Sequence, residues 1–199
     1  MEAFLMRLFK LIPLLIVLPL ALAACGEPDI ETNMSETVKP FEYTNQDNQK
    51  FGLDDLKGDW WLADFIFTNC TTVCLPMTSN MKQLQTKTKQ EVIDIQFISF
   101  SIDPERDKPD VMKKYAESYN ADTKNWNFLT GYEFQTIKEL SILSFKSIAE
   151  KPPEGMDTDQ FTHGTRFYLV NPEGKVVKSY SGAESGSVKE IMDDLKKLK

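Results

Sequence analysis

The chain has 199 residues, of which 41% are hydrophobic and 27% are charged, a composition that is ordinary for a globular domain. This length fits one domain with appendages, and it allows an adequate core without disulfide staples. The formal net charge of −7 argues against a nucleic-acid-binding protein, which needs a basic surface, so we expect no nucleic-acid partner.

The first 25 residues have the organisation of a secretory signal peptide. Arg7 and Lys10 precede an apolar run over residues 11–22, which is short for a membrane span and contains two prolines. The run ends in Leu-Ala-Ala-Cys, which resembles the lipobox of bacterial lipoproteins. We therefore expect a signal peptide over 1–24, lipidation of Cys25, and a lipid-anchored protein on the outer face of the cytoplasmic membrane. The alternative is an uncleaved signal anchor in which Cys25 is unmodified.

The next segment, residues 25–39, is polar, acidic and poor in aromatic side chains, which favours a flexible tether. Residues 40–199 are then expected to form a single domain. It begins with a predicted hairpin over 41–43 and 50–52, followed by a short helical turn over 53–58. Residues 60–67 are apolar and aromatic, and they predict a buried strand.

Two cysteines, Cys70 and Cys74, follow that strand, and a helical pattern begins at Met77. The first N–H groups of a helix are unpaired and carry partial positive charge, which lowers the pKa of a cysteine and favours its thiolate. Thiolates bind soft metals and attack disulfides. A spacing of four residues lets both sulfurs reach one ion or, after slight unwinding, each other. The alternatives are a plain stabilising disulfide and two inert core cysteines.

Strands and helices alternate along the rest of the chain. The pattern predicts strands over 93–102, 126–129, 166–170 and 175–180, helices over 111–119, 134–145 and 188–198, and a loop over 151–161. This order predicts an α/β fold with a mixed sheet and helices on both faces. The cysteines then lie at the carboxyl edge of the sheet, where open α/β folds place ligands. The thioredoxin fold meets these conditions.

Two other side chains, His163 and Asp103, are candidates for a role at that edge, and another acidic residue lies in the strand before the cysteines. His163 is the only histidine, and its alternative is a surface position in a loop. Asp103 ends the strand over 93–102, and its alternative is a helix cap or turn former. Asp64 lies inside the first apolar strand, where a paired or hydrogen-bonded structural carboxylate is the ordinary interpretation.

These segments together resemble a known family. The chain contains D-F-I-F-T-N-C-T-T-V-C-x-P-M-T, F-S-I-D-P-E-R-D, W-N-F-L-T-G and a histidine just before F-Y-L-V-N-P-E-G-K-V. It resembles the Sco (SenC) family of cytochrome oxidase assembly proteins over nearly all of residues 40–198, most closely the lipoprotein members from Gram-positive bacteria. Leu75 departs from the proline usual there, and Gly164 and Thr165 stand where small hydroxyl residues are commoner. Neither departure removes a ligand.

The resemblance implies a thioredoxin-like fold and one copper ion per monomer, held by Cys70, Cys74 and His163 with Asp103 nearby. Two thiolates suit Cu(I), and an added imidazole makes a site that can also hold Cu(II). The implied function is a metallochaperone that delivers copper to the dinuclear copper centre of cytochrome c oxidase subunit II. The implied partners are that subunit, the membrane through a lipid anchor, and a copper donor or thiol reductant.

A second function uses the same cysteines. Cys70 and Cys74 can act as the redox-active pair of a thiol–disulfide oxidoreductase that reduces the copper-site cysteines of that subunit. His163 separates the two hypotheses, because disulfide exchange needs no distant imidazole. A thioredoxin-like peroxidase is disfavoured, because it would have no second cysteine at this spacing. Apart from the oxidoreductase alternative, we expect no enzymatic activity.

Overall fold

The computed structural model describes residues 28–155, 158–184 and 186–199. The predicted signal peptide over 1–24 and the predicted lipidation site, Cys25, lie outside these residues. Among the described helices, none combines the length and the apolar character that a membrane crossing requires.

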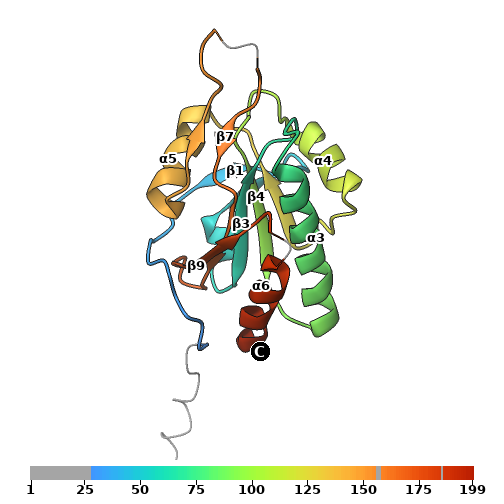
Figure 1. The fold of residues 1–199 in the computed structure, drawn as a ribbon, viewed down its shortest axis with the longest axis vertical. Helices are drawn as coiled ribbons and strands as arrows, with labels where there is room; N and C mark the ends of the chain where they lie inside the picture. The colour runs from blue at the N-terminus through green and yellow to red at the C-terminus, as the bar shows by residue number, and fades with distance from the viewer. Residues whose placement is uncertain (1–27, 156–157, 185) are drawn as a thin grey trace, which may run out of the picture.

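A five-stranded mixed sheet forms the centre of the molecule, in the order β5–β4–β3–β8–β9 (Figure 1). The central strand β3 (Trp61–Ile66) is parallel to β4 (Gln96–Ser101), which is parallel to β5 (Trp126–Leu129). On the other side of β3, β8 (Arg166–Val170) is antiparallel to it, and β9 (Val176–Ser181) is antiparallel to β8. Every residue of β3 is buried, which confirms the predicted core strand.

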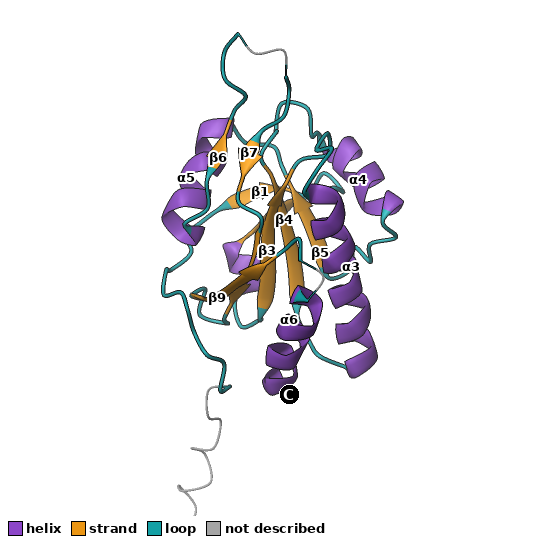
Figure 2. Cartoon of the chain, in the orientation of Figure 1, coloured by secondary structure: helices purple, strands orange, loops and turns teal. Residues whose placement is uncertain are grey.

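Helices cover both faces of the sheet, as predicted. Figures 1 and 2 show α3 (Cys74–Glu91), α4 (Pro109–Ser118) and α6 (Ser187–Leu195) on one side and α5 (Phe134–Phe145) on the other. Successive strand side chains point to opposite faces. Phe65 therefore packs against Phe145 of α5, with ring centroids 5.4 Å apart, while its neighbours in β3 face the α3 side. The chain ends in a 3-10 turn, η3 (Lys196–Leu198).

Two hairpins flank the sheet. The predicted N-terminal hairpin is present as β1 (Glu42–Thr44) and β2 (Lys50–Gly52), and the 3-10 turn η2 (Leu53–Leu56) follows it. A second hairpin, β6 (Ala149–Glu150) with β7 (Thr162–His163), was not predicted. Its strands have two residues each, which is too short for alternation to reveal them. This hairpin brackets the predicted loop over 151–161.

The described part of the predicted tether packs on the domain, and this corrects the expectation for residues 28–39. Ile30 and Val38 are buried. The side chain of Asn33 accepts a hydrogen bond from the N–H of Ser179 at 2.8 Å and donates one to its carbonyl oxygen at 3.0 Å. These contacts satisfy polar groups of β9, so a segment with polar composition still gains enough partners to be ordered.

Candidate metal centre

Sheet topology brings three distant segments to one edge. Because β3 and β4 are parallel, the turn carrying the cysteines and the turn carrying Asp103 both leave the sheet at the same edge. Because β8 is antiparallel to β3, it begins at that edge, and His163 comes just before it. The fold therefore places His163 beside cysteines that are far away in the sequence.

The structure brings Cys70, Cys74 and His163 into one buried group. Their sulfur and ring-nitrogen atoms all lie within 4.8 Å of one another. The Sγ of Cys74 is 3.3 Å from Nε2 of His163, and the N–H of Cys74 points at the Sγ of Cys70, 3.4 Å away. Both cysteines are free thiols rather than a disulfide. The alternative of a surface histidine is wrong, because His163 is 8% exposed.

The ring of His163 is held with one nitrogen facing the sulfurs. Nδ1 lies 2.9 Å from the carbonyl oxygen of Gly164, and a carbonyl can only accept, so Nδ1 carries the proton. This leaves a lone pair on Nε2, the nitrogen that faces Cys74. The ring of Phe67 packs edge-on against the imidazole, with centroids 5.7 Å apart. The imidazole is thus oriented as a metal-binding histidine must be.

The two thiols differ in acidity. Burial raises the pKa of Cys70, but interactions with His163, Cys74 and the nearby backbone outweigh it and lower the pKa to about 6. Burial raises the pKa of Cys74 well above its ordinary value, and the neighbouring Cys70 thiolate adds to that rise. The expectation that the helix start lowers both pKa values is therefore wrong for Cys74. Cys74 is the first residue of α3, yet its sulfur is buried. The backbone N–H of Cys74 donates instead to the sulfur of Cys70.

The donor set fits copper. Two sulfurs and one imidazole nitrogen are soft or intermediate ligands, which Cu(I) prefers and Cu(II) accepts. Three ligands fall short of the four that a structural zinc site supplies. Among the described residues, no carboxylate belongs to this group. The residues present therefore suit a copper ion and leave one side of it open to another ligand.

Asp103 lies near this group without joining it. Its carboxylate is 3.3 Å from Nε of Arg106, and its carbonyl oxygen accepts the N–H groups of Arg106 and Asp107. The turn-former interpretation thus describes its local contacts. The guanidinium of Arg106 also contacts Asp159 at 3.0 Å, and Asp159 accepts a hydrogen bond of 2.6 Å from Asn69, the residue before Cys70. Asp103 is therefore linked to the cysteine turn through a chain of polar contacts.

Two residues missed by the sequence analysis support the cysteine turn. Asp107, fully buried, accepts hydrogen bonds from the N–H and hydroxyl of Thr68 and from the hydroxyl of Ser101. Gln160, in the loop before His163, donates to the carbonyl of Asn69 at 3.0 Å. Asp107 could have been found from the sequence, because it is the second aspartate of the D-P-E-R-D segment. No sequence signal marked Gln160, because its contact with Asn69 depends on how the loop folds back.

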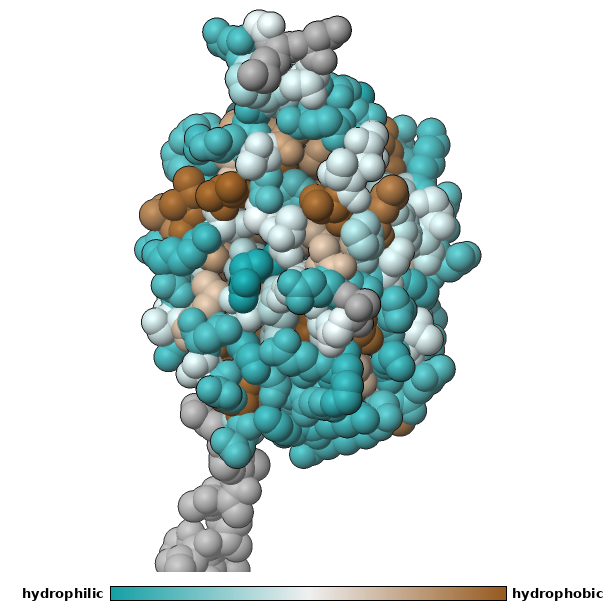
Figure 3. All heavy atoms as spheres, in the orientation of Figure 1, coloured by the Kyte–Doolittle hydropathy of each residue, from teal (hydrophilic) through white to brown (hydrophobic). Residues whose placement is uncertain are grey.

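The surface around the centre is partly apolar. Leu75, next to Cys74, is 50% exposed. Figure 3 shows hydrophobic side chains on the half of the molecule that carries β7, the start of α3 and α5, whereas α6 is covered by hydrophilic ones. Three exposed apolar residues, Ile142, Leu143 and Ile148, lie on or just after α5. In that view, the half of the molecule that carries the metal centre is less hydrophilic than the half that carries α6.

Comparison with known proteins gives a consistent result. The family model described as SCO1/SenC matches residues 30–199. The chain is 50% identical to the "SCO1 protein homolog" of Bacillus subtilis (strain 168) over 177 residues, which cover 89% of this chain and 90% of that protein.

Solved structures with similar folds have related descriptions. A SCO1/SenC family lipoprotein from Bacillus anthracis is 47% identical, with a TM-score of 0.77 over 82% of this chain and 95% of the other. BsSco, described with a disulfide switch and as a member of the Sco family of cytochrome c oxidase assembly proteins, is 48% identical, with a TM-score of 0.73 over 85% and 96%. Arabidopsis thaliana ScoI with copper bound is 25% identical, with a TM-score of 0.69 over 81% and 98%. The thioredoxin-like fold predicted from the sequence is confirmed.

Proposed function

Because this chain belongs to the SCO1/SenC family, we propose that it binds copper and delivers it to the dinuclear copper centre of cytochrome c oxidase subunit II. Copper is the cargo, held by Cys70, Cys74 and His163. Support comes from the copper-bound structure of a relative and from the description of BsSco as an oxidase assembly protein.

The observation that carries the proposal is the lone pair of His163 Nε2 facing the Cys74 sulfur at 3.3 Å. Two thiolates and a neutral imidazole give a net charge of −1 with Cu(I) and zero with Cu(II), so both oxidation states can be held without a large unbalanced charge. Cys70 supplies a thiolate near neutral pH, since its pKa is about 6. Cys74 releases its proton when the metal arrives, as any thiol ligand must.

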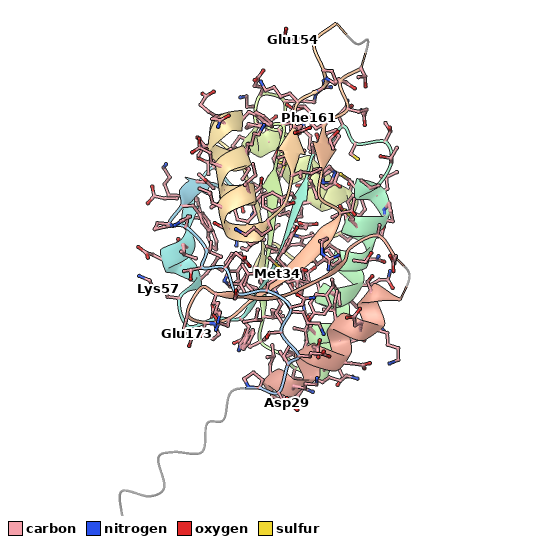
Figure 4. The ribbon with its side chains drawn as sticks, turned by 60° about the vertical axis from the view of Figure 1, so that its left-hand side comes forward. Asp29, Met34, Lys57, Glu154, Phe161 and Glu173 are labelled. Carbon is pink, nitrogen blue, oxygen red and sulfur yellow. The ribbon has the colours of Figure 1, made fainter. Side chains whose placement is uncertain are left out.

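The position of the centre suits transfer to a membrane-bound partner. Asp29, near the first described residue, lies at the opposite end of the molecule from Glu154 and Phe161, which mark the end with the metal centre (Figure 4). A lipid on Cys25 would hold the Asp29 end near the bilayer and leave the centre at the far end. An extracytoplasmic copper-binding domain could then approach its open side, beside the exposed Leu75.

Thiol–disulfide exchange with the same subunit is the second candidate. It is favoured by the low pKa of Cys70, because an attacking sulfur must be a thiolate. It needs no metal-binding nitrogen, so the lone pair that His163 directs at the sulfurs would have no use in it, and we place copper delivery first.

The deciding experiment is a copper titration of the purified, reduced full-length chain. Wild type should bind one copper ion per monomer, and Cu(II) should give intense thiolate-to-copper absorption. Thermal unfolding should shift upward, because a ligand held only by the folded state stabilises that state. A reduced protein that stays colourless with Cu(II) and gains no thermal stability would overturn the proposal.

A further inference from the structure

Asp64 is an acidic side chain enclosed within the protein. It lies in the middle of β3 and has no exposed surface. Neither carboxylate oxygen has a hydrogen-bond partner of normal geometry among the residues that the structure describes, although the Ser99 hydroxyl lies close enough to lower the carboxyl pKa. Burying a carboxyl group without a partner is strongly unfavourable, and native cores avoid it. The well-formed hydrogen bond that the ordinary structural interpretation expects is therefore missing among these residues.

Asp64 lies on the face of the sheet that α3 covers. Its register neighbour on β4 is Ser99, whose hydroxyl oxygen accepts the indole N–H of Trp126 at 3.0 Å. The adjacent residue, Phe65, points to the other face, toward α5. The carboxyl group therefore lies beneath the helix that begins at Cys74.

The groups around Asp64 couple it to the metal centre. Two titratable side chains near this face interact with Asp64 by charge: Cys74 of α3 and His163 of β7. Tyr115 of α4 lies next to α3, where its hydroxyl is hydrogen-bonded to that of Thr78. The Asp64 carboxylate helps to raise the pKa of Cys74. Burial raises the pKa of Asp64 itself to about 7, which the Ser99 hydroxyl and the charge of His163 oppose only in part. Asp64 is thus within electrostatic reach of two of the three proposed ligands.

We propose that Asp64 is the buried counter-charge of the metal centre: without being a ligand, its carboxylate favours Cu(II) over Cu(I) at Cys70, Cys74 and His163. This rests on the copper-binding function proposed above. With Cu(II) the two thiolates and the imidazole form a neutral centre, whereas with Cu(I) the centre is negative. A nearby buried negative charge disfavours the negative Cu(I) centre, and the protein interior screens this repulsion less than water does. Asp64 acts through this field, so it is a positioning residue.

The test compares Asp64→Asn with wild type in the reduced full-length chain. Affinities for Cu(I) and Cu(II) are measured separately by competition with chelators at about pH 8, where Asp64 is ionised. The ratio of the Cu(II) to the Cu(I) association constant should fall by about tenfold or more in Asp64→Asn. Both ions displace the same thiol protons, so those protons cancel in the ratio. Near pH 5.5, where wild-type Asp64 is protonated, the difference should shrink.

Asp194→Asn is the matched control. Asp194 is also buried, at 5% exposed, but its carboxylate bonds Lys178 and Tyr180 in the region of α6, away from the centre. This variant should lose stability and keep the wild-type ratio. A change of similar size in both variants would overturn the inference, because it would show an effect of any buried carboxylate.

A metal-free measurement gives an independent readout. The pKa of Asp64 is about 7 in the folded chain and near its ordinary value of 3.8 in the unfolded one. Wild type should therefore lose stability as pH rises from about 4 to about 7, and Asp64→Asn should lack this loss. If both proteins show the same pH dependence, the carboxylate is not the buried charge that the inference requires.

The outcomes separate the inference from the proposed function. If wild type binds no copper, the proposed function fails and the inference fails with it. If wild type and Asp64→Asn bind copper with equal ratios, only the inference fails. Should Asp64→Asn not fold, Asp64→Ser carries the same test, since its smaller side chain leaves room for water. In wild type, the ratio of the Cu(II) to the Cu(I) association constant should also rise between about pH 6 and 8, as Asp64 ionises. If this ratio does not change with pH and is the same in Asp64→Asn, the inference is overturned.

Discussion

Nε2 of His163 lies 3.3 Å from Sγ of Cys74, and the other ring nitrogen is fixed by the carbonyl of Gly164. The imidazole therefore offers an acceptor to a thiol that burial keeps protonated. Cys70, on the other side of the same group, is the thiol whose pKa is lowered. The metal-free centre thus holds one thiolate and one thiol, and its two cysteines should be distinguishable chemically.

Alkylation should show this difference. With a small reagent such as iodoacetamide, the rate at Cys70 should rise with pH and level off above about pH 7, because its pKa is about 6. Cys74, which is 1% exposed and has a raised pKa, should react far more slowly over the same range. Mass spectrometry of peptides from the native reduced protein measures both rates. Equal rates would contradict the assigned acidities.

Asp107 should be important for stability. Asp107→Ala removes the acceptor of three hydrogen bonds and leaves the N–H and hydroxyl of Thr68 and the hydroxyl of Ser101 without it. We expect a loss of about 2–4 kcal/mol in the free energy of unfolding, because buried polar groups are left unpaired. Urea denaturation of the metal-free protein measures the loss.

Asp159→Ala is the control for that measurement. The side chain of Asp159 is 52% exposed and joins Arg106 to Asn69 at the surface. An exposed pair of this kind contributes at most about 1 kcal/mol. A loss as large as that of Asp107→Ala would show that surface contacts, rather than the buried acceptor, hold the cysteine turn.

The sequence predicted elements with strong periodicity well. The bounds of β5 and α5 match the predicted 126–129 and 134–145, because both are continuous apolar patterns between polar turns. The helix α3 begins at Cys74, three residues before the predicted Met77. Pro76 obscured this start, although proline is tolerated in the first turn, where N–H groups have no partner in the helix.

The candidate site could be predicted as a set of residues but not as an arrangement. The resemblance to a known family supplied Cys70, Cys74 and His163, and the predicted sheet placed the cysteines at the correct edge. The acidity of Cys74 could not be predicted, because it depends on how completely the fold encloses the sulfur. The contact between Gln160 and Asn69 could not be predicted either, since it forms only when the hairpin of β6 and β7 closes.

Cys25→Ser tests the predicted lipid anchor. If Cys25 is the lipidation site, the variant should leave the membrane or persist as an unprocessed precursor, because two acyl chains anchor stably and their loss removes that attachment. Fractionation of cells, with immunoblotting of the membrane and released fractions, measures this. Ser35→Ala, in the described segment after the cysteine, is the control and should stay with the membrane. A correctly cleaved Cys25→Ser protein that remains in the membrane fraction would contradict the prediction.

His163→Ala decides between copper delivery and disulfide reduction in cells. The substitution leaves Cys70 and Cys74 in place, so disulfide exchange should survive, although loss of the interaction with His163 should raise the pKa of Cys70 and slow attack somewhat. Cu(I) should still bind through two sulfurs, whereas Cu(II) should be lost or greatly weakened, because it depends more on a nitrogen donor.

A copper-delivery role that uses both oxidation states should then fail. At limiting copper, His163→Ala cells should have lower activity of the oxidase that carries the dinuclear copper centre, and added copper should restore part of it. Cys70→Ser should abolish function under either hypothesis, so it serves as the loss-of-function reference. If His163→Ala cells assemble the oxidase as well as wild type at limiting copper, delivery is the wrong function and the reductase hypothesis gains. The imidazole would then have no metal-binding role in this process.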